Sequence, residues 1–305
     1  MILTQEPSVC VCILAHNEEK YINRTLAAIC STKEAETVPV YVYANGCSDR
    51  TAEEVTRFAQ THGNVQLCEL PIASKPLAWN TAFAAHQSEF IVFSDGDILV
   101  EPGAALQLVN ELRTFPDAVI ATCRQVAVDE GVTFQQKLVG FMHIPLVQNF
   151  LAGGFYAVRR QSLANLLEQK GFTALPSGVA GEDAFLDYLV GPERLVVSEA
   201  CAAYVPPHLN DYCRYLARIQ WQNEQIRICW QNIAPEHGSM KRIVNKIRRI
   251  SSFRRLCVAV LAVSARHLYR MLFSSRIANH YRNIGPLRIN GAEVLRDATR
   301  SLSAK

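Results

Sequence analysis

Short apolar runs alternate with amphipathic stretches through the first hundred residues of the chain. Four runs have the length and the β-branched or aromatic content of buried strands: 9–15, 38–43, 65–70 and 90–93. Helical spacing or a helix-start signal follows the first three runs, at 22–29, from 51 onward and at 77–85. Strand–helix alternation at this spacing predicts an α/β fold with a mostly parallel, doubly wound sheet.

The pattern is less regular in the second half of the chain. Strands are predicted near 119–122 and at 195–204, and a helix is predicted at 212–230. The spacing from 135 to 150 is helical, but Pro145 interrupts it because proline has no amide hydrogen to give to the helix. We assign no role to the stretch 118–150.

Polar side chains gather where the predicted strands end. Asp95-Gly96-Asp97 directly follows the apolar run 90–93. Unpaired charges are costly inside a sheet, so we expect both carboxylates at the carboxyl end of that strand, facing a crevice of the kind that binds ligands in α/β proteins. Two carboxylates beside a diphosphate give a divalent cation the hard oxygen ligands that it needs. The alternative interpretation is a plain strand-to-turn junction, where Asp and Gly are common for backbone reasons.

Four such motifs occur in a fixed order: Ala15-His16-Asn17-Glu18-Glu19, Ala44-Asn45-Gly46-Cys47-Ser48-Asp49-Arg50-Thr51, Lys75 with Ala78 and Asn80, and Asp95-Gly96-Asp97. In this order and at these strand ends they resemble the family 2 glycosyltransferases. The resemblance implies the GT-A fold, a nucleotide diphosphate sugar as donor, and Mn²⁺ or Mg²⁺ as cofactor. It also implies a donor site made of Ala15, Asn17, Glu18, Asn45, Asp49, Lys75, Asn80, Asp95 and Gly96, with the metal on Asp97 and with Asp95 on the ribose or the metal.

One position departs from the family pattern. The family usually has Asp where this chain has Asn45, and Ala44 replaces the neighbouring acid. In the family that acid accepts a hydrogen bond from the imide N–H of uracil. An Asn can accept the same bond but can also donate, so the departure leaves the choice of nucleobase open. A turn with positive φ at Asn45-Gly46 is compatible with either role.

The second half carries residues that resemble the family's acceptor side. Gly153 and Gly154 precede an apolar run and allow a ligand to approach the backbone, although a plain turn is the alternative. Glu182-Asp183 resembles the family's acidic pair at a helix start, which implies that Asp183 is the general base of inverting transfer and that Glu182 supports it or binds the acceptor. An ordinary helix cap is the alternative interpretation.

Two further residues are candidates on weaker grounds. His208 follows the predicted strand 195–204, where some GT-A enzymes have a third metal ligand, although a lone His is more often structural. Arg218 lies in the predicted helix 212–230 and is a candidate for contact with the diphosphate, as is Arg214. The local sequence Arg218-Ile219-Gln220-Trp221 does not fit the Q-x-x-R-W pattern of processive members, which indicates a non-processive relative.

Charge is distributed unevenly. The net charge is only +3, so the chain as a whole does not have the character of a nucleic-acid binder, but no Asp or Glu occurs between Glu236 and Glu293. Basic residues and helically spaced apolar residues fill 241–288, a pattern typical of helices that bind an anionic membrane surface. A helix packed on its own domain or on a partner is the alternative. Membrane contact would make a lipid-linked acceptor more plausible, beside a sugar or another hydroxyl acceptor.

The ten cysteines lie within apolar runs and contain no C-x-x-C spacing, which favours buried thiols in a reducing compartment over a structural zinc site. With no signal sequence visible at the start, we expect a cytoplasmic protein, peripheral at the inner face of the membrane if the basic tail binds there. The domain prediction is a catalytic domain at 1–235, divided into a nucleotide-binding half at 1–100 and an acceptor half at 101–235, and a basic amphipathic helical extension at 236–305.

The sequence therefore predicts an inverting, metal-assisted glycosyltransferase in the biosynthesis of a polysaccharide, glycolipid or other glycoconjugate. Two alternatives remain. A sugar nucleotidyltransferase shares the sheet, but it should have a glycine-rich, basic loop after the first strand, and 16–19 is acidic here. A non-catalytic module with a degenerate site would explain Asn45 and the missing Q-x-x-R-W, but the intact Asp95, Asp97 and Asp183 argue against it.

Overall fold

The structure is a computed structural model, and it describes residues 7–128, 131–143, 150–230, 233 and 253–283. The chain divides into two compact units. Unit 1 comprises Met1–Val126, Phe150–Leu175 and Leu186–Tyr204, and unit 2 comprises Ala127–Asn149, Pro176–Phe185 and Val205–Lys305. The predicted domain boundaries, at 100 and 235, stay a prediction.

Unit 1 contains a sheet of eight strands in the order β3-β2-β1-β4-β7-β6-β8-β5. Its strands are β1 (Val9–Ala15), β2 (Val40–Asn45), β3 (Val65–Leu70), β4 (Phe90–Asp95), β5 (Leu99–Val100), β6 (Ile120–Ala127), β7 (Phe155–Arg159) and β8 (Leu195–Tyr204). The first four strands of that order are parallel, as predicted. Beyond β4 the sheet is mixed, since β7 pairs antiparallel to both β4 and β6, and β5 pairs antiparallel to β8.

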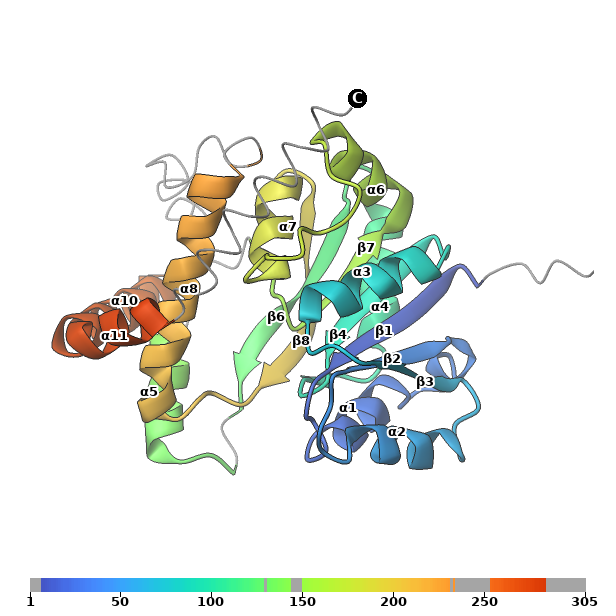
Figure 1. Cartoon of the computed structure of the whole chain (residues 1–305), viewed down its shortest axis with the longest axis horizontal. Helices are drawn as coiled ribbons and strands as arrows, with labels where there is room; N and C mark the ends of the chain where they lie inside the picture. The colour runs from blue at the N-terminus through green and yellow to red at the C-terminus, as the bar shows by residue number, and fades with distance from the viewer. Residues whose placement is uncertain (1–6, 129–130, 144–149, 231–232, 234–252, 284–305) are drawn as a thin grey trace, which may run out of the picture. The chain divides into compact units, whose positions relative to one another are not determined.

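The helices of unit 1 cover both faces of this sheet (Figure 1). They are α1 (Ile22–Ile29), α2 (Thr51–Ala59), α3 (Lys75–Ala85), α4 (Ala104–Thr114) and α6 (Arg160–Gln169), with a short 3₁₀ turn at Ala35–Thr37. One core joins α1, α2 and α4 to alternate residues of the strands, such as Val11 and Val92. On the opposite face Trp79 of α3 stacks on Phe93, and its indole N–H donates to the Tyr156 hydroxyl at 2.9 Å.

Three elements in the first hundred residues have bounds that differ from the prediction. The second strand begins at Val40 and not at 38, and Pro39, which has no N–H for a ladder bond, directly precedes it. Helix α3 begins at Lys75 and not at 77, because the Ser74 hydroxyl caps it by accepting a hydrogen bond from the Leu77 N–H. Strand β4 continues to Asp95, so the first acid of the Asp-Gly-Asp motif is the last residue of the strand.

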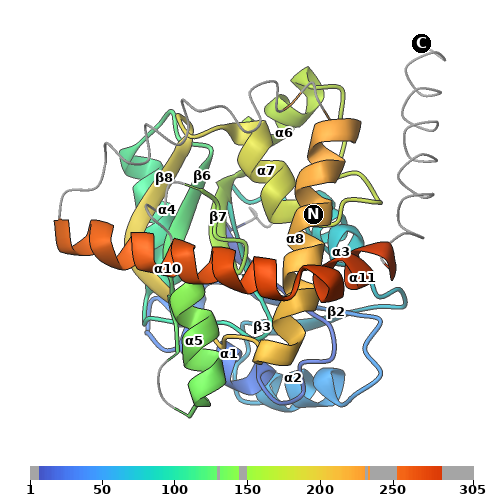
Figure 2. The ribbon, with the colours of Figure 1, turned by 90° about the vertical axis from the view of Figure 1, so that its left-hand side faces the viewer.

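Unit 2 is helical. It contains α5 (Phe134–Met142), α8 (Leu209–Cys229), α10 (Phe253–Leu272) and α11 (Ser274–Asn283), and the first turn of α7 (Glu182–Val190). Figure 2 shows α10 crossing α5, and α11 beside α8. A hydrogen bond joins α10 to the start of α8, because the Tyr269 hydroxyl donates to the Leu209 carbonyl at 2.9 Å. The predicted break at Pro145 lies outside the described residues, as do the parts 241–252 and 284–288 of the predicted basic helical range 241–288.

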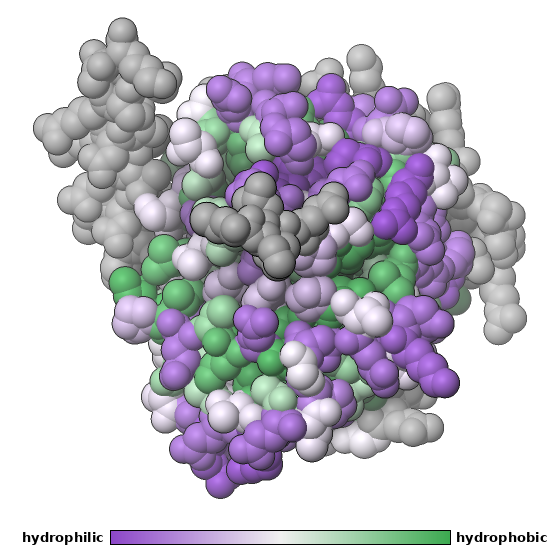
Figure 3. Space-filling view, turned by 90° about the vertical axis from the view of Figure 1, so that its right-hand side faces the viewer, coloured by the Kyte–Doolittle hydropathy of each residue, from purple (hydrophilic) through white to green (hydrophobic). Residues whose placement is uncertain are grey.

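The side of unit 1 that lies to the right in Figure 1 faces the viewer in Figure 3, where hydrophilic and hydrophobic residues are interspersed. Such a mixture is ordinary for a solvated protein surface. Within the described part of the chain, no helix has the length and apolar character needed to cross a membrane.

Candidate functional site

The turns that follow β1 and β2 are joined by hydrogen bonds. The Asn17 side-chain oxygen accepts from the Ser48 N–H at 2.8 Å, and the Asn17 N–H donates to the Cys47 sulfur at 3.4 Å. Asn17 has φ +59°, a left-handed conformation that Asn adopts more readily than most residues. The two strand ends thus form one polar surface, and Asn17 helps to build it.

Asp49 completes the junction between these turns. Its carboxylate accepts hydrogen bonds from the Thr51 N–H at 3.0 Å, the Thr51 hydroxyl at 2.5 Å and the Glu19 N–H at 3.0 Å. Burial acts to raise the pKa of Asp49, but these hydrogen bonds outweigh it and lower the pKa below its usual value. Both oxygens of Asp49 therefore organise the start of α2, which is a structural use of a residue that we predicted to shape the nucleotide pocket.

Asn45 is buried at the end of β2, with 3% of its surface exposed. Its side-chain NH₂ donates to the Ala15 carbonyl at 2.8 Å and to the Tyr43 carbonyl at 3.5 Å. The Asn45 carbonyl accepts a hydrogen bond from His16 Nδ1 at 2.7 Å. Because the amide nitrogen faces backbone carbonyls, the donor half of this side chain is in use, and the Oδ1 oxygen is the half that can accept from a ligand.

The Asp95-Gly96-Asp97 strand end is fixed by its neighbours in unit 1. The Asp95 N–H donates to the Gly154 carbonyl at 2.9 Å, and the Thr25 hydroxyl donates to the Gly96 carbonyl at 2.9 Å. A Cβ at Gly96 would lie 3.0 Å from Glu18 Cγ and 3.1 Å from Ala15 Cβ, so glycine lets the first and fourth strand ends approach closely.

Gly154 is confined as well. A Cβ there would lie 2.7 Å from the Cδ1 of Ile98, so a larger residue would displace the Ile98 side chain. Of the predicted pair Gly153-Gly154, Gly154 therefore fulfils a packing requirement next to β4. Contact of this pair with an acceptor stays a prediction.

Negative charge is concentrated around this strand end. Burial and the negative charges of Asp97 and Asp95 raise the pKa of the Glu18 carboxyl to about 7. The Lys75 ammonium offsets part of the charge, since its Nζ lies 2.6 Å from Asp95 Oδ1. The structure thus gathers these predicted donor-site residues at one end of the parallel strands: Ala15, Asn17, Glu18, Asn45, Asp49, Lys75, Asp95, Gly96 and Asp97.

The carboxylates at this strand end fit a divalent cation whose coordination shell would be completed by oxygens of a diphosphate. Within the described ranges no three His, Cys, Asp or Glu side chains are grouped as a full metal site. Two carboxylates offer hard oxygen ligands to a cation whose other ligands are phosphates. Such a cation would relieve the repulsion from Asp97 and Asp95, which adds to burial in raising the pKa of Glu18. The role of His208 as a third ligand stays a prediction; in unit 2 this residue directly precedes α8.

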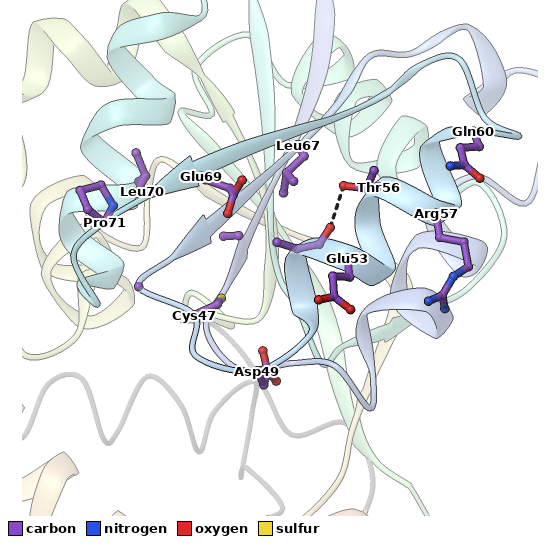
Figure 4. A pocket seen from close by; sticks show the side chains of 13 residues that line it. Cys47, Asp49, Glu53, Thr56, Arg57, Gln60, Leu67, Glu69, Leu70 and Pro71 are labelled. Carbon is purple, nitrogen blue, oxygen red and sulfur yellow. Dashed lines mark hydrogen bonds between the residues drawn. The ribbon is translucent and has the colours of Figure 1, made fainter.

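A groove of about 970 Å³ lies next to the joined turns, between α2 and β3 (Figure 4). It shares Cys47 and Asp49 with the turn after β2, and Glu53 of α2 and Glu69 of β3 lie along it. Arg57 is the one cation among its lining residues, all of which are described, and its guanidinium pairs with Glu54 at 2.7 Å. The carboxylates make this groove unsuited to a diphosphate, and neither Asp95 nor Asp97 lines it.

Asn80 has a role that the motif did not predict. Its side-chain NH₂ donates to the Leu175 carbonyl at 2.8 Å, and its oxygen accepts from the Leu175 N–H at 2.8 Å. The Asn80 side chain thus binds both the N–H and the carbonyl of Leu175, as a neighbouring β-strand would. Asn80 therefore anchors a distant loop of unit 1, and its predicted contact with the donor remains untested.

The acceptor-side candidates of unit 2 lie on α7 and α8. Glu182 and Asp183 form the first turn of α7, as predicted, and Glu182 is 3% exposed. Asp183 Oδ1 accepts from the Ala184 N–H at 2.8 Å. Arg218 is exposed on α8, and its guanidinium lies over the Tyr215 ring at 5.5 Å from the centroid.

Sequence reasoning missed three polar residues around these motifs. Thr25 is fully buried in unit 1, and Gln222 and Gln225 are buried on α8 in unit 2. Thr25 occurs at helical spacing within the apolar face of α1, and a polar residue at such a position is the signal that could have identified it. No comparable signal marks the two glutamines, because their partners are more than 40 positions away.

The chain is similar to a known protein family and to solved structures. Residues 10–171 match the model of the family described as Glycosyl transferase family 2. Mannosyltransferase PcManGT from Pyrobaculum calidifontis, solved with GDP-Man and Mn²⁺, is 20% identical, with 97% of this chain and 87% of that chain covered and a TM-score of 0.57. TarS 1–349 from S. aureus, solved with UDP, is 15% identical, with 97% and 91% covered and a TM-score of 0.47. A search of curated proteins finds no match.

Proposed function

The chain belongs to glycosyl transferase family 2 and has the GT-A fold, and from that premise we propose that it transfers a sugar, with inversion, from a nucleotide diphosphate donor to an acceptor hydroxyl. One observation carries the proposal. The ends of β1, β2 and β4 are joined into a single polar surface that presents Asp95 and Asp97 beside Lys75. Carboxylates and a cation at the carboxyl ends of parallel strands are suited to a metal-bound diphosphate.

Asp97 and Asp95 would hold Mn²⁺ or Mg²⁺ together with oxygens of the diphosphate. The ion supplies Lewis-acid stabilisation of the charge on the departing diphosphate. Lys75 lies at Asp95 and contributes positive charge to the same end of the sheet. Glu18, half-buried beside these acids, repels a free diphosphate when it is ionised, so binding of the nucleotide without a cation should be weak.

Asp183 is the general base of the proposed reaction. The acceptor oxygen attacks the anomeric carbon, its proton passes to the Asp183 carboxylate, and the bond from that carbon to the diphosphate breaks with its electron pair on the leaving oxygen. The position of Asp183 in the first turn of α7 supports this role, because the helix dipole there favours the ionised carboxylate. Glu182 is a supporting or acceptor-binding group.

Asn45 is proposed to read the nucleobase. Its Oδ1 oxygen accepts a hydrogen bond while its NH₂ remains on the Ala15 carbonyl. Uracil, thymine and guanine each present a ring N–H that can donate to such an acceptor, whereas the ring nitrogens on the pairing edge of cytosine and adenine accept. We therefore propose a uridine, thymidine or guanosine diphosphate sugar as the donor.

The C-terminal helices support the proposed contact with an anionic membrane and thus a lipid-linked acceptor. Helix α10 exposes a row of large apolar side chains: Val260, Leu261, Leu268, Met271 and Leu272. Neither α10 nor α11 contains an acidic residue, whereas both contain arginines. Of the basic residues in the predicted range, Lys241, Arg242, Lys246, Arg248, Arg249 and Arg288 lie outside the described residues.

Vesicle sedimentation tests the membrane proposal. We expect binding to vesicles that contain phosphatidylserine, weaker binding to pure phosphatidylcholine, and a loss of both with Leu261→Gln and Leu272→Gln combined. Equal recovery of the wild type and the double variant with the acidic vesicles would contradict it.

Calorimetry of nucleotide binding tests the donor site first. UDP, GDP, dTDP and CDP are titrated with Mn²⁺ and with EDTA into the wild type, Asp97→Ala and Asp117→Ala, the last being a matched control at an exposed acid outside the site. We expect one nucleotide other than CDP to bind only with the metal and only where Asp97 is intact. Metal-independent binding that Asp97→Ala leaves unchanged would refute the metal-assisted mechanism.

Asp183→Asn separates chemistry from donor binding. The amide cannot take the acceptor proton, so we expect turnover of the donor identified by calorimetry to fall about 100-fold to 10,000-fold with nucleotide binding unchanged. Anomeric configuration of the product, read by NMR, tests inversion. A retained configuration, or full turnover by Asp183→Asn, would show that Asp183 is not the base.

A further inference from the structure

Two glutamines of α8 hold the backbone segment that leads into Glu182-Asp183. Gln225 accepts a hydrogen bond from the Ala180 N–H at 2.9 Å and donates to the Gly178 carbonyl at 2.5 Å. Gln222 donates to the Ala180 carbonyl at 3.1 Å. The N–H and C=O of Ala180 are thus both bound by side chains from one helix, in the way that a neighbouring strand would bind them.

The segment is shaped to receive these side chains. A Cβ at Gly181 would lie 2.0 Å from the Gln222 side-chain nitrogen, so any other residue at 181 would displace that amide. Gln222 and Gln225 are 7% and 2% exposed, and buried amides of this kind are costly to leave without hydrogen bonds. The positions of the two glutamine side chains and of the 178–181 backbone are therefore tightly coupled.

The constraint extends into the first turn of α7. Phe185 of α7 packs edge-on against Trp230, which follows α8, with ring centroids 5.2 Å apart. Asp183 lies near enough to Tyr215 of α8 that its negative charge adds to burial in raising the pKa of that tyrosine. Helix α8 thus contacts the residues before the Glu182-Asp183 pair, and Trp230, the residue after this helix, contacts Phe185 beyond the pair.

We infer that Gln222 and Gln225 are positioning residues for the Asp183 carboxylate, acting through the backbone of 178–181. This rests on the proposed role of Asp183 as general base. Neither glutamine needs to touch the donor or the acceptor. Their function is to set where the first turn of α7 begins and hence where the base lies, and a shift of about 1 Å in a reacting group can cost about 100-fold in rate.

The test uses variants that remove the hydrogen bonds but keep the volume. Gln225→Met loses both bonds, and Gln225→Glu keeps the acceptor for the Ala180 N–H. Gly181→Ala displaces Gln222 without changing α8, but its Cβ would also lie 2.9 Å from Asp183 Oδ1, so Gln225→Met is the variant that isolates the effect of the glutamines. Gln220→Met on the exposed face of α8, and Gly63→Ala, where an added Cβ meets nothing within 4 Å, are the matched controls.

We expect Gln225→Met and Gly181→Ala to lower kcat about 10-fold to 100-fold while the Kd of the nucleotide with Mn²⁺ stays within about twofold of the wild type. Gln225→Glu should be intermediate. A merely structural role would lower the amount of folded protein but leave kcat per folded molecule unchanged, and that result would overturn the inference.

Amide hydrogen exchange gives a readout that does not depend on turnover. Exchange in the peptide covering 178–185 should become faster in Gln225→Met and Gly181→Ala, and should not change in the two controls. Unchanged exchange would show that the glutamines do not hold the segment. If exchange rises and nucleotide binding persists but Asp183→Asn retains full turnover, the assignment of the base has failed and the inference fails with it.

Discussion

Asn45→Asp should destabilise the protein, although it restores the residue that the family usually has at this position. The Asn45 side-chain NH₂ donates to the Ala15 carbonyl at 2.8 Å. A carboxylate has no hydrogen to donate, so the substitution places an oxygen against that carbonyl in a site that is 3% exposed. Here the amide is a structural donor, and the acid that serves other family members conflicts with the local backbone.

The magnitude follows from two contributions. Loss of a neutral hydrogen bond costs about 1 kcal/mol, and a buried charged group without a compensating partner adds about 1–3 kcal/mol. We therefore expect a free energy of unfolding lower by about 2–4 kcal/mol at pH 8. Burial raises the pKa of the introduced carboxyl above its unfolded value, so the cost is small in acid and grows as the pH rises through the folded pKa.

Urea unfolding at pH 5 and pH 8 measures this difference. Asn45→Ala, which removes the donor without adding charge, is the control and should show a loss that does not depend on pH. The reasoning is refuted if Asn45→Asp is as stable as the wild type at pH 8, or if its loss of stability is the same at both pH values. Calorimetry on the same variants reports whether the position also selects the nucleobase.

Three further substitutions test the local geometry, each by unfolding. Gly46→Ala should cost at least about 1–2 kcal/mol, because φ is +58° and the added Cβ would lie 2.3 Å from the Ala73 nitrogen. Glu18→Gln should raise stability relative to the wild type above pH 7 and have little effect below pH 4.5, because burial and neighbouring acids raise the pKa of Glu18 to about 7 and oppose its ionisation. His143→Phe should resist acid better, because burial and two arginines lower the pKa of His143 to about 4, so that the folded state loses stability as the pH falls from about 6.5 towards 4.

Each of these substitutions has a control at an exposed site. Gly63→Ala, where an added Cβ meets nothing, should change stability little. Glu34→Gln and His267→Phe lie at exposed positions and should not alter the pH profile. A pH profile of Glu18→Gln that runs parallel to that of the wild type would remove the electrostatic argument for a metal at this strand end.

The strands and the polar clusters at their ends were predictable because their signals are local. A buried parallel strand is a continuous apolar run, and the polar residues that follow it mark the edge where ligands bind. The observed bounds differ from the predicted ones where a single residue sets the start of an element, as with the Ser74 cap of α3 and Pro39 before β2. The antiparallel pairing of β7 with β4 was not predictable, since β7 is separated from β4 by about sixty residues.

The roles of individual polar residues were less predictable than the motifs that contain them. Asp49 and Asn80 match the family pattern, yet their side chains bind the backbone of Thr51, Glu19 and Leu175. Gln222 and Gln225 belong to no motif that we recognised. In each case the decisive partner is fixed by tertiary packing, which a pattern read along the chain does not contain.

The pairing of β4 with β7 has a consequence for the order in which the protein matures on the ribosome. β4 finds its second neighbour only when residues 155–159 have been synthesised, and the Asp95 N–H binds the Gly154 carbonyl from that late segment. Until then the strand that ends in Asp95 has an open, apolar edge, the kind of surface that chaperones bind and that aggregates when left exposed. A nascent chain that has already formed β1 to β4 in parallel order must therefore protect this edge before Asp95 and Asp97 reach their final positions.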